Sequence, residues 1–391
     1  MVISDLWLLL LPVAAASGWF VAKRKDADGS SSNKQKRKKD VILSRDYLLG
    51  LNFLLNEEHD KALSVFIKML EVDSDTIETH LTLGNLFRRR GEVERAIRIH
   101  QNLIARPNLE RTYRTQALMA LARDYLSAGV LDRAERLFLE LIDLGESVEK
   151  SSNYLLDIYQ QEKEWQKAIN VAQKLGSNMN VVIAHYYCEL AELDVKGGHI
   201  DQASRFLKRA LAVDKHCVRA SLLFAKLDLD RSRYKQAIRH LKRVKEQNSD
   251  FFSEAILPLG EAYKALSKEK DLVFYFKDVL KEFPRIPIAI MLSEEIRQWR
   301  GDKVAVNFVA DYVRKHPSVA GLHRLVELHL LLVEGKARDD LLVLRGLTEK
   351  LLAEHATYQC ANCGFAGNKI HWQCPSCKQW STVKPTYALE G

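Results

Sequence analysis

The apolar and small positions of this 391-residue chain follow a long repeat, with little of the alternation that marks a β-strand. Gly50 and Gly84 lie 34 positions apart, and so do Ala62 and Ala96. The surrounding segments read LGLNFLLNEEHDKALSVF and LGNLFRRRGEVERAIRIH, and each has an aromatic residue three positions after its glycine. A period of this length indicates a stack of helical hairpins, because each repeat is one pair of helices.

The small residues of the repeat mark the place where its two helices cross. The alanine series continues with Ala134, Ala168, Ala203 and Ala237, at steps of 38, 34, 35 and 34. A small residue at the eighth position of each unit and alanine at the twentieth allow a close approach that bulkier side chains would prevent. Larger residues are predicted to fill the layer between hairpins, so we interpret them as core and not as a cofactor site. They are Phe53, Phe87, Tyr125, Tyr159 and Tyr263 at the eleventh position, and Phe66 and Phe138 at the twenty-fourth.

This pattern predicts an all-α fold, a superhelical solenoid over residues 44–353. Pro284 and Pro317 fall at the thirty-second position of two later units, where proline ends the second helix. The units match the tetratricopeptide repeat (TPR) closely. We expect about eight hairpins as far as His316, or nine with a less regular helical pair that reaches Ala353 and caps the stack.

An uncharged apolar run predicts a single transmembrane helix at residues 1–22. No charge occurs from Leu6 to Ala22, and a helix of 22 residues is about 33 Å long, enough to cross the core of a bilayer. A cleaved signal peptide is the competing interpretation, but it carries basic residues before the apolar run, whereas here they follow it. By the positive-inside rule the N-terminus is expected to be periplasmic and the bulk of the chain cytoplasmic, in a single-pass protein of the cell inner membrane.

Residues 23–43 are predicted to be a basic tether. Between Lys23 and Asp40 there are eight basic and three acidic side chains, so this stretch supplies +5 of the formal net charge of +8. It lacks apolar residues and is expected to be a flexible linker. A topology signal explains its charge at least as well as binding to anionic lipid does. The remainder of the chain is close to neutral, so no nucleic-acid partner is expected.

The first helices of TPR hairpins line a concave groove in which a partner can bind. By that register Asn85, Arg88, Arg89 and Arg123 face the groove, where they would suit an acidic segment or a C-terminal carboxylate. The competing interpretation is a solvated helix face. His323 is a further candidate for partner contact or for a structural role, because its spacing of six from the next histidine does not suit two metal ligands on one helix face.

The strongest chemical signal lies in residues 354–391, where Cys360, Cys363, Cys374 and Cys377 form the pattern C-x2-C-x10-C-x2-C. Two tight turns would bring four thiolates to one metal ion, and two separate dithiol redox pairs are the alternative. Four protein ligands leave no position for a catalytic water, so the metal is predicted to be structural. Zinc is preferred, and iron is the other candidate because the C-P-x-C half resembles rubredoxin.

A domain of this size cannot bury a core of its own. Phe365, Trp372 and Trp380 are therefore expected to pack around the metal turns and against the last helices of the solenoid. The other two cysteines, Cys188 and Cys217, lie in helical patterns and are interpreted as small buried residues.

These parts, in this order, resemble the lipopolysaccharide assembly protein B family of Gram-negative bacteria over essentially the whole chain. The resemblance rests on the apolar anchor with its basic tether, on repeats that include HLTLGNLFRRRGEVERAIRIHQ, and on the terminal CPSCKQWSTVKP. It implies a non-enzymatic inner-membrane adaptor that works with the membrane protease FtsH to degrade the deacetylase LpxC, which commits carbon to lipid A, and so limits lipopolysaccharide synthesis. It also implies a rubredoxin-like metal domain that packs on the repeats. Other lipopolysaccharide assembly or sensing membrane proteins and a second copy of the chain are further candidate partners.

Three other functions fit parts of the sequence less well. A TPR scaffold with a rubredoxin-like electron-transfer centre requires a redox-active iron. A nucleic-acid-binding zinc ribbon needs more basic residues among its aromatics than Lys369, Lys378 and Lys384 supply. An enzyme is disfavoured because the sequence has no recognisable nucleophile–base group, phosphate loop or HExxH motif.

Overall fold

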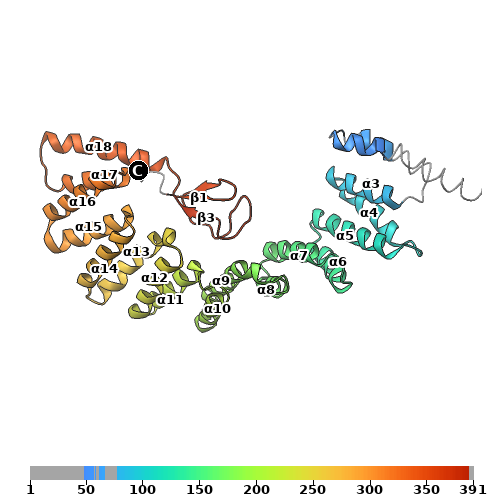
Figure 1. The fold of residues 1–391 in the computed structure, drawn as a ribbon, viewed down its shortest axis with the longest axis horizontal. Coiled ribbons are helices and arrows are strands. Elements are labelled where there is room, and N and C mark those ends of the chain that lie inside the picture. The colour runs from blue at the N-terminus through green and yellow to red at the C-terminus, as the bar shows by residue number, and fades with distance from the viewer. Residues whose placement is uncertain (1–47, 57, 59–60, 67–76, 387–391) are drawn as a thin grey trace, which may run out of the picture. The chain divides into compact units, whose positions relative to one another are not determined.

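The computed structural model describes residues 48–56, 58, 61–66 and 77–386. Within them the chain is a series of helices followed by a small sheet (Figure 1). The helices are α3 (Ile77–Arg89), α4 (Val93–Ile104), α5 (Arg111–Ser127), α6 (Leu131–Asp143), α7 (Val148–Glu162), α8 (Trp165–Lys174), α9 (Asn180–Lys196), α10 (Ile200–Val213), α11 (Val218–Asp230), α12 (Tyr234–Gln247), α13 (Ser253–Ala265), α14 (Glu269–Glu282), α15 (Ile286–Arg300), α16 (Asp302–Lys315), α17 (Val319–Leu330) and α18 (Lys336–Ala353), with two short 3-10 helices, η1 (Ser177–Met179) and η2 (Ser249–Phe251).

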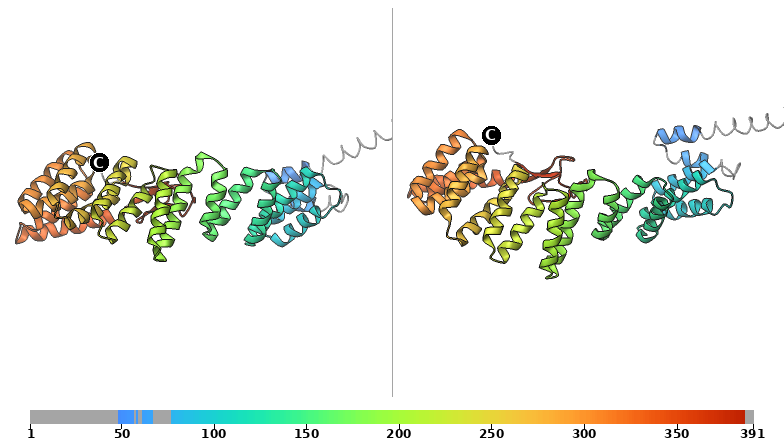
Figure 2. Two further views of the ribbon diagram at one scale, coloured as in Figure 1. Left: turned by 90° about the horizontal axis from the view of Figure 1, so that it is seen from below. Right: turned by 60° about the horizontal axis from the view of Figure 1, so that its bottom comes forward.

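The chain divides into two compact units, an N-terminal unit of residues 1–158 and a C-terminal unit of residues 159–391, and each is described by itself. From α3 to α6 in the N-terminal unit and from α8 to α18 in the C-terminal unit, helices that follow one another in sequence pack side by side. In the C-terminal unit the pairs from α9/α10 to α15/α16 follow one another in order (Figure 2). The predicted helical solenoid is confirmed over the described residues.

The repeat positions have the burial that the sequence predicts. The six repeat alanines are completely buried: Ala62, Ala96, Ala134, Ala168, Ala203 and Ala237. The aromatic residues Phe87, Tyr125, Tyr159 and Tyr263 are also buried, whereas Phe53 is half-buried. Helices α14 and α16 each end two residues before a proline, Pro284 and Pro317. The final pair, α17 and α18, ends at Ala353 as expected.

Helices α3 and α4 approach most closely at Gly84. A Cβ atom added there would overlap the imidazole of His100 on α4. His100 lies four residues after Ala96, the position that holds Phe66 and Phe138 in other repeats, and it is completely buried. The small residue at the eighth position, Gly84, is therefore required because the ring at the twenty-fourth position, His100, packs directly against it. In this repeat that ring is polar.

The buried imidazole belongs to an ionic group that joins α3, α4 and α5. Asp124 on α5 is completely buried; its Oδ1 accepts a hydrogen bond from Arg88 Nη1 at 2.7 Å, and its Oδ2 lies 2.5 Å from His100 Nδ1. The Arg88 side chain is 9% exposed and also donates to Asn85 Oδ1 at 2.6 Å. A buried carboxylate is costly unless it is paired, so these contacts favour one register of the three helices. Arg88, expected to face a partner, is used inside the fold.

A three-stranded antiparallel sheet follows the last helix. Strand β1 (Tyr358–Cys360) lies in the middle, between β2 (Ala366–Gly367) and β3 (Val383–Pro385). Tyr358 pairs with Gly367 on one side and with Pro385 on the other. The strands are short, so the sheet serves mainly to hold the loops between them.

None of the helices in the described ranges is long and apolar enough to cross a membrane. The transmembrane helix predicted at residues 1–22 and the tether predicted at residues 23–43 lie outside those ranges.

Two glycine substitutions test the close approach of the helices. Gly84→Ala should destabilise the N-terminal unit by about 1–3 kcal/mol, because the new methyl group overlaps His100. Gly346→Ala on α18 is the matched control, since a Cβ there meets no atom within 4 Å, and it should stabilise its helix by about 0.5–1 kcal/mol. Urea unfolding followed by circular dichroism measures both. Equal effects of the two substitutions would contradict this account.

Candidate metal centre and its seat on the helices

Two similar turns carry the four cysteines. In the first, the amide of Gly364 donates to the carbonyl of Cys360 at 3.0 Å, and in the second the amide of Lys378 donates to that of Cys374 at 2.9 Å. The fifth residue of each turn has a left-handed backbone, with φ of 76° at Gly364 and 60° at Lys378. Glycine adopts this conformation without strain in the first turn, and a lysine adopts it in the second.

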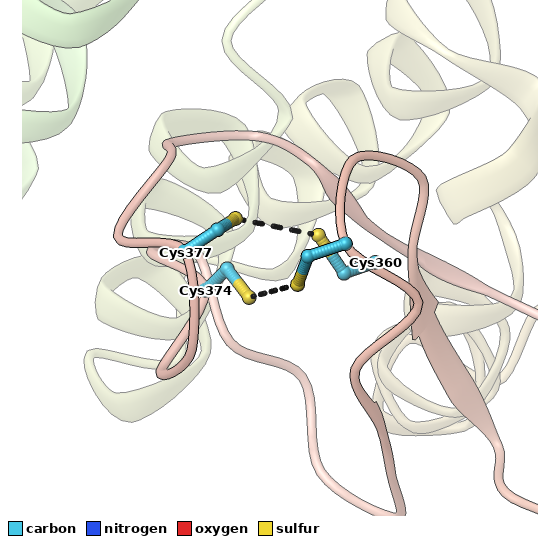
Figure 3. A group of neighbouring side chains, drawn as sticks. Cys360, Cys374 and Cys377 are labelled. Atoms are coloured by element: carbon cyan, nitrogen blue, oxygen red, sulfur yellow. Dashed lines mark hydrogen bonds between the residues drawn. The ribbon is translucent and has the colours of Figure 1, made fainter. Parts of the chain in front are cut away.

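The two turns face each other and bring the four sulfur atoms together (Figure 3). All four Sγ atoms lie within 4.8 Å of one another, with Cys360 and Cys377 3.7 Å apart and Cys363 and Cys374 3.6 Å apart. A tetrahedral ion with metal–sulfur bonds of about 2.3 Å places its sulfurs about 3.8 Å apart. The donor set therefore fits one ion in a closed S4 site, which confirms the predicted four-cysteine metal site and suits zinc and iron alike.

Hydrogen bonding and burial set the protonation of the thiols before a metal binds. The Thr382 hydroxyl lies 3.3 Å from Cys360 Sγ and lowers the pKa of Cys360 to about 6. The Asn362 side chain lowers the pKa of Cys377, whereas burial raises the pKa of Cys374 to about 11. Metal binding near neutral pH must therefore displace a proton from Cys374, while the Cys360 thiolate is already favoured.

The metal domain packs on a surface of the helices, which we call its seat. Trp380, just after the second turn, inserts into this surface among aromatic residues of α8 and α9. Its ring meets Trp165 edge to face at 6.4 Å between centroids and Tyr186 at 5.7 Å, and it stacks on His185 at 5.1 Å. Its indole N–H donates to Gln160 Oε1 at 2.9 Å. Trp380 is half-buried, and both its apolar ring and its polar N–H find partners on the helices.

His185 makes the central polar contact of this seat. Its Nε2 lies 2.5 Å from the Ser381 hydroxyl, and its Nδ1 is buried without a hydrogen-bond partner. Burial, with a smaller contribution from the positive charge of Arg219, lowers the pKa of His185 to about 3. The imidazole is therefore neutral while the metal domain is docked.

A second group of contacts joins the metal domain to η2 and α13. The Trp372 ring stacks on Phe251 at 5.5 Å between centroids. The Tyr358 hydroxyl donates to Glu254 Oε1 at 2.6 Å, and Lys384 lies 3.9 Å from Asp250. The seat thus extends along the C-terminal unit from the end of α7 to the start of α13.

The expectation that the tryptophans pack on the last helices is wrong. Trp372 and Trp380 reach α8, α9 and η2, and Phe365 stays inside the metal domain beside Tyr358 and Cys360. The physical reason is that complementary partners, Gln160 and His185, are displayed by the middle repeats. In the sequence Gln160 and His185 look like ordinary polar positions of helices. Only the large apolar rings of Trp372 and Trp380 indicated that the metal domain covers another surface.

The predicted groove residues lie in two different environments. Arg89 and Arg123 are exposed, and the Arg123 guanidinium lies over the Tyr154 ring at 5.9 Å. Asn85 and Arg88 bond to each other, as described above. His323 lies between helices, because its Nδ1 is 2.8 Å from the Thr348 hydroxyl of α18. Cys188 and Cys217 are buried as expected, with their sulfurs 4.0 Å apart.

Removal of one ligand should release both the metal and the domain that it organises. Cys374→Ser should lose the ion and speed hydrogen exchange in α9 and α13 by about tenfold or more, because the seat then loses its cover. Ser376→Ala, an exposed change in the same turn, is the control and should leave both unchanged. Metal analysis combined with hydrogen exchange measures the two effects. Unchanged exchange in a metal-free Cys374→Ser protein would contradict the seat.

Acid should loosen the seat through His185. Because docking lowers the pKa of His185, the undocked state binds more protons, so docking weakens as pH falls from the ordinary value of 6.5 toward 3. The loss is at most about 1.4 kcal/mol per pH unit for one proton. His185→Gln keeps a nitrogen for Ser381 but does not titrate, and it should flatten this dependence. Tryptophan fluorescence between about pH 7 and about pH 5.5, with the metal content of each sample recorded, is the measurement.

Comparisons with known proteins agree with this architecture. Residues 358–385 match the family model of a rubredoxin metal binding domain, and residues 79–115 and 194–257 match tetratricopeptide repeats. The chain is 39% identical to lipopolysaccharide assembly protein B of Escherichia coli (strain K12), over 99% of each chain. It is 37% identical to the protein of the same name from Haemophilus influenzae, over 97% of this chain and 98% of that one.

Among solved structures, the complex of Naa15/Naa10 bound to HypK-THB matches at 12% identity with a TM-score of 0.42, over 76% of this chain and 45% of the other. This level of similarity adds nothing on function. The identity of 37–39% to the curated relatives extends over nearly the whole chain, and the metal domain and the repeats match as well. Together these matches establish the family. The chain belongs to the lipopolysaccharide assembly protein B family.

Proposed function

We propose that this protein is a non-enzymatic adaptor of the inner membrane, which limits lipopolysaccharide synthesis by bringing the deacetylase LpxC to the protease FtsH. Its membership of the lipopolysaccharide assembly protein B family supports a role in lipopolysaccharide assembly. The protease and the deacetylase come from the family resemblance, whereas the predicted orientation with a periplasmic N-terminus comes from the positive-inside rule.

The seat of the metal domain is the observation that carries an adaptor function. Cys360, Cys363, Cys374 and Cys377 would fill all four positions around a tetrahedral ion, which would leave no position to bind water or substrate. The domain is fixed to the helices by the Trp380 ring stacked on His185, by Ser381 beside the same imidazole, and by the Tyr358 hydroxyl on Glu254. A closed site on a rigid scaffold supports binding of partners better than it supports chemistry.

The predicted anchor gives this adaptor a physical advantage. A transmembrane helix at residues 1–22 would hold the solenoid at the same surface as a membrane protease. Confinement raises the effective concentration of two weakly binding partners. The exposed Arg89 and Arg123 are our candidates for contact with an acidic segment of a partner. Arg88 is not among them, because Asp124 holds its guanidinium.

The half-life of LpxC in cells tests the proposal. With FtsH present, deletion of this protein should lengthen the half-life of LpxC several-fold. Trp380→Ala should have a similar effect, because it removes about 2–4 kcal/mol of contact from the seat. Trp299→Ala is the matched control, since Trp299 is 48% exposed on α15, away from the seat, and it should behave as wild type. An unchanged half-life in the deletion strain would refute the adaptor function.

A further inference from the structure

The last helix of the solenoid presents an apolar stripe to solvent. On α18 only Thr348 is buried, whereas Val343, Leu347 and Leu351 are 66%, 55% and 45% exposed. In the described part of the chain, α17 is the only element that packs extensively on α18, which is the outermost helix of the series in Figure 1. Each hairpin of a solenoid normally has its apolar face covered by the next, so this stripe lacks a cover.

The stripe has the spacing of a two-helix seam. Positions 336, 340, 343, 347, 350 and 354 are separated by 4, 3, 4, 3 and 4 residues, the alternation that keeps side chains on one face of a helix against a partner helix. Val343 and Leu347 occupy the two central positions, and Leu344 and Leu351 widen the apolar surface beside them. Such a seam fits one further helix lying along α18.

The charges of the seam identify that helix. Lys336 and Asp340 lie at its beginning, and Lys350 and Glu354 lie at its end. All four are exposed, and no salt bridge links them to another described residue. If a second α18 lies antiparallel with its centre opposite Arg345, Lys336 faces Glu354, Asp340 faces Lys350, and Val343 faces Leu347. Every facing pair is then of opposite charge or apolar.

We propose that α18 is a dimer interface that pairs with α18 of a second copy of this chain, antiparallel about a twofold axis that crosses the seam at the level of Arg345. A twofold contact repeats each favourable pair, so a self-matched seam gains every interaction twice. A helix of another protein would have no need of charges that are matched within α18 itself. This inference is independent of the proposed function, because it concerns assembly and not the partners.

Lysine substitutions test the apolar centre. In sedimentation equilibrium of the full-length chain in detergent micelles, over a micromolar concentration series, the wild-type protein should dimerise. Leu347→Lys should raise the dissociation constant by about tenfold or more, since it buries two charges in the seam. Leu342→Lys, the same substitution at a 38% exposed position on another face of α18, should leave the constant unchanged. Unaltered helical content shows that neither variant is unfolded.

Charge reversals test the antiparallel register. Asp340→Lys and Lys350→Asp should each weaken the dimer by about three- to tenfold, because each places like charges opposite one another. The double variant, and an equimolar mixture of the two single variants, should recover the wild-type affinity. Recovery supports the register. A monomeric wild-type protein, a dimer that Leu347→Lys leaves intact, or weakening without recovery would each overturn the proposal.

Discussion

The close approach of paired helices is the constraint on which the rest of the structure depends. Alanine at the twentieth position of each repeat is completely buried in six units, and it lets the two helices of a hairpin pack with almost no side chain between them. A tight hairpin offers a flat face to the next one, so the helices stack in order. The seat for the metal domain is a surface of that stack, and its residues keep their positions only while the hairpins stay in register.

Features that depend on the spacing of residues along the chain could be predicted from the sequence. The alanine period, the prolines after α14 and α16, and the four cysteines are each a local pattern with one physical meaning, and each was confirmed. The seat was not predictable in this way. His185 and Ser381 are 196 positions apart, and Gln160 and Trp380 are 220 apart, so no pattern along the chain relates them. Arg88 shows the same limit, because its buried partner Asp124 lies in the following repeat.

Buried polar groups fix how neighbouring helices are aligned, where apolar packing alone would allow several alignments. Apolar layers of similar size slide against one another at little cost, whereas a buried charge or imidazole tolerates only one arrangement of its partners. The Arg88, Asp124 and His100 group does this in the N-terminal unit. In the C-terminal unit Arg219 on α11, which is 4% exposed, donates to Glu189 and Glu192 on α9 at 2.9 and 2.8 Å.

The breadth of the metal domain's seat changes how the solenoid responds to force and heat. A stack of repeats is held by contacts between neighbours, so it is flexible along its length and can unfold one hairpin at a time. The metal domain touches Gln160 at the end of α7 and Glu254 at the start of α13, and so it splints hairpins that do not touch each other. Between those points the metal domain should stiffen the stack of hairpins. That stiffness would depend on the one metal ion that organises the domain.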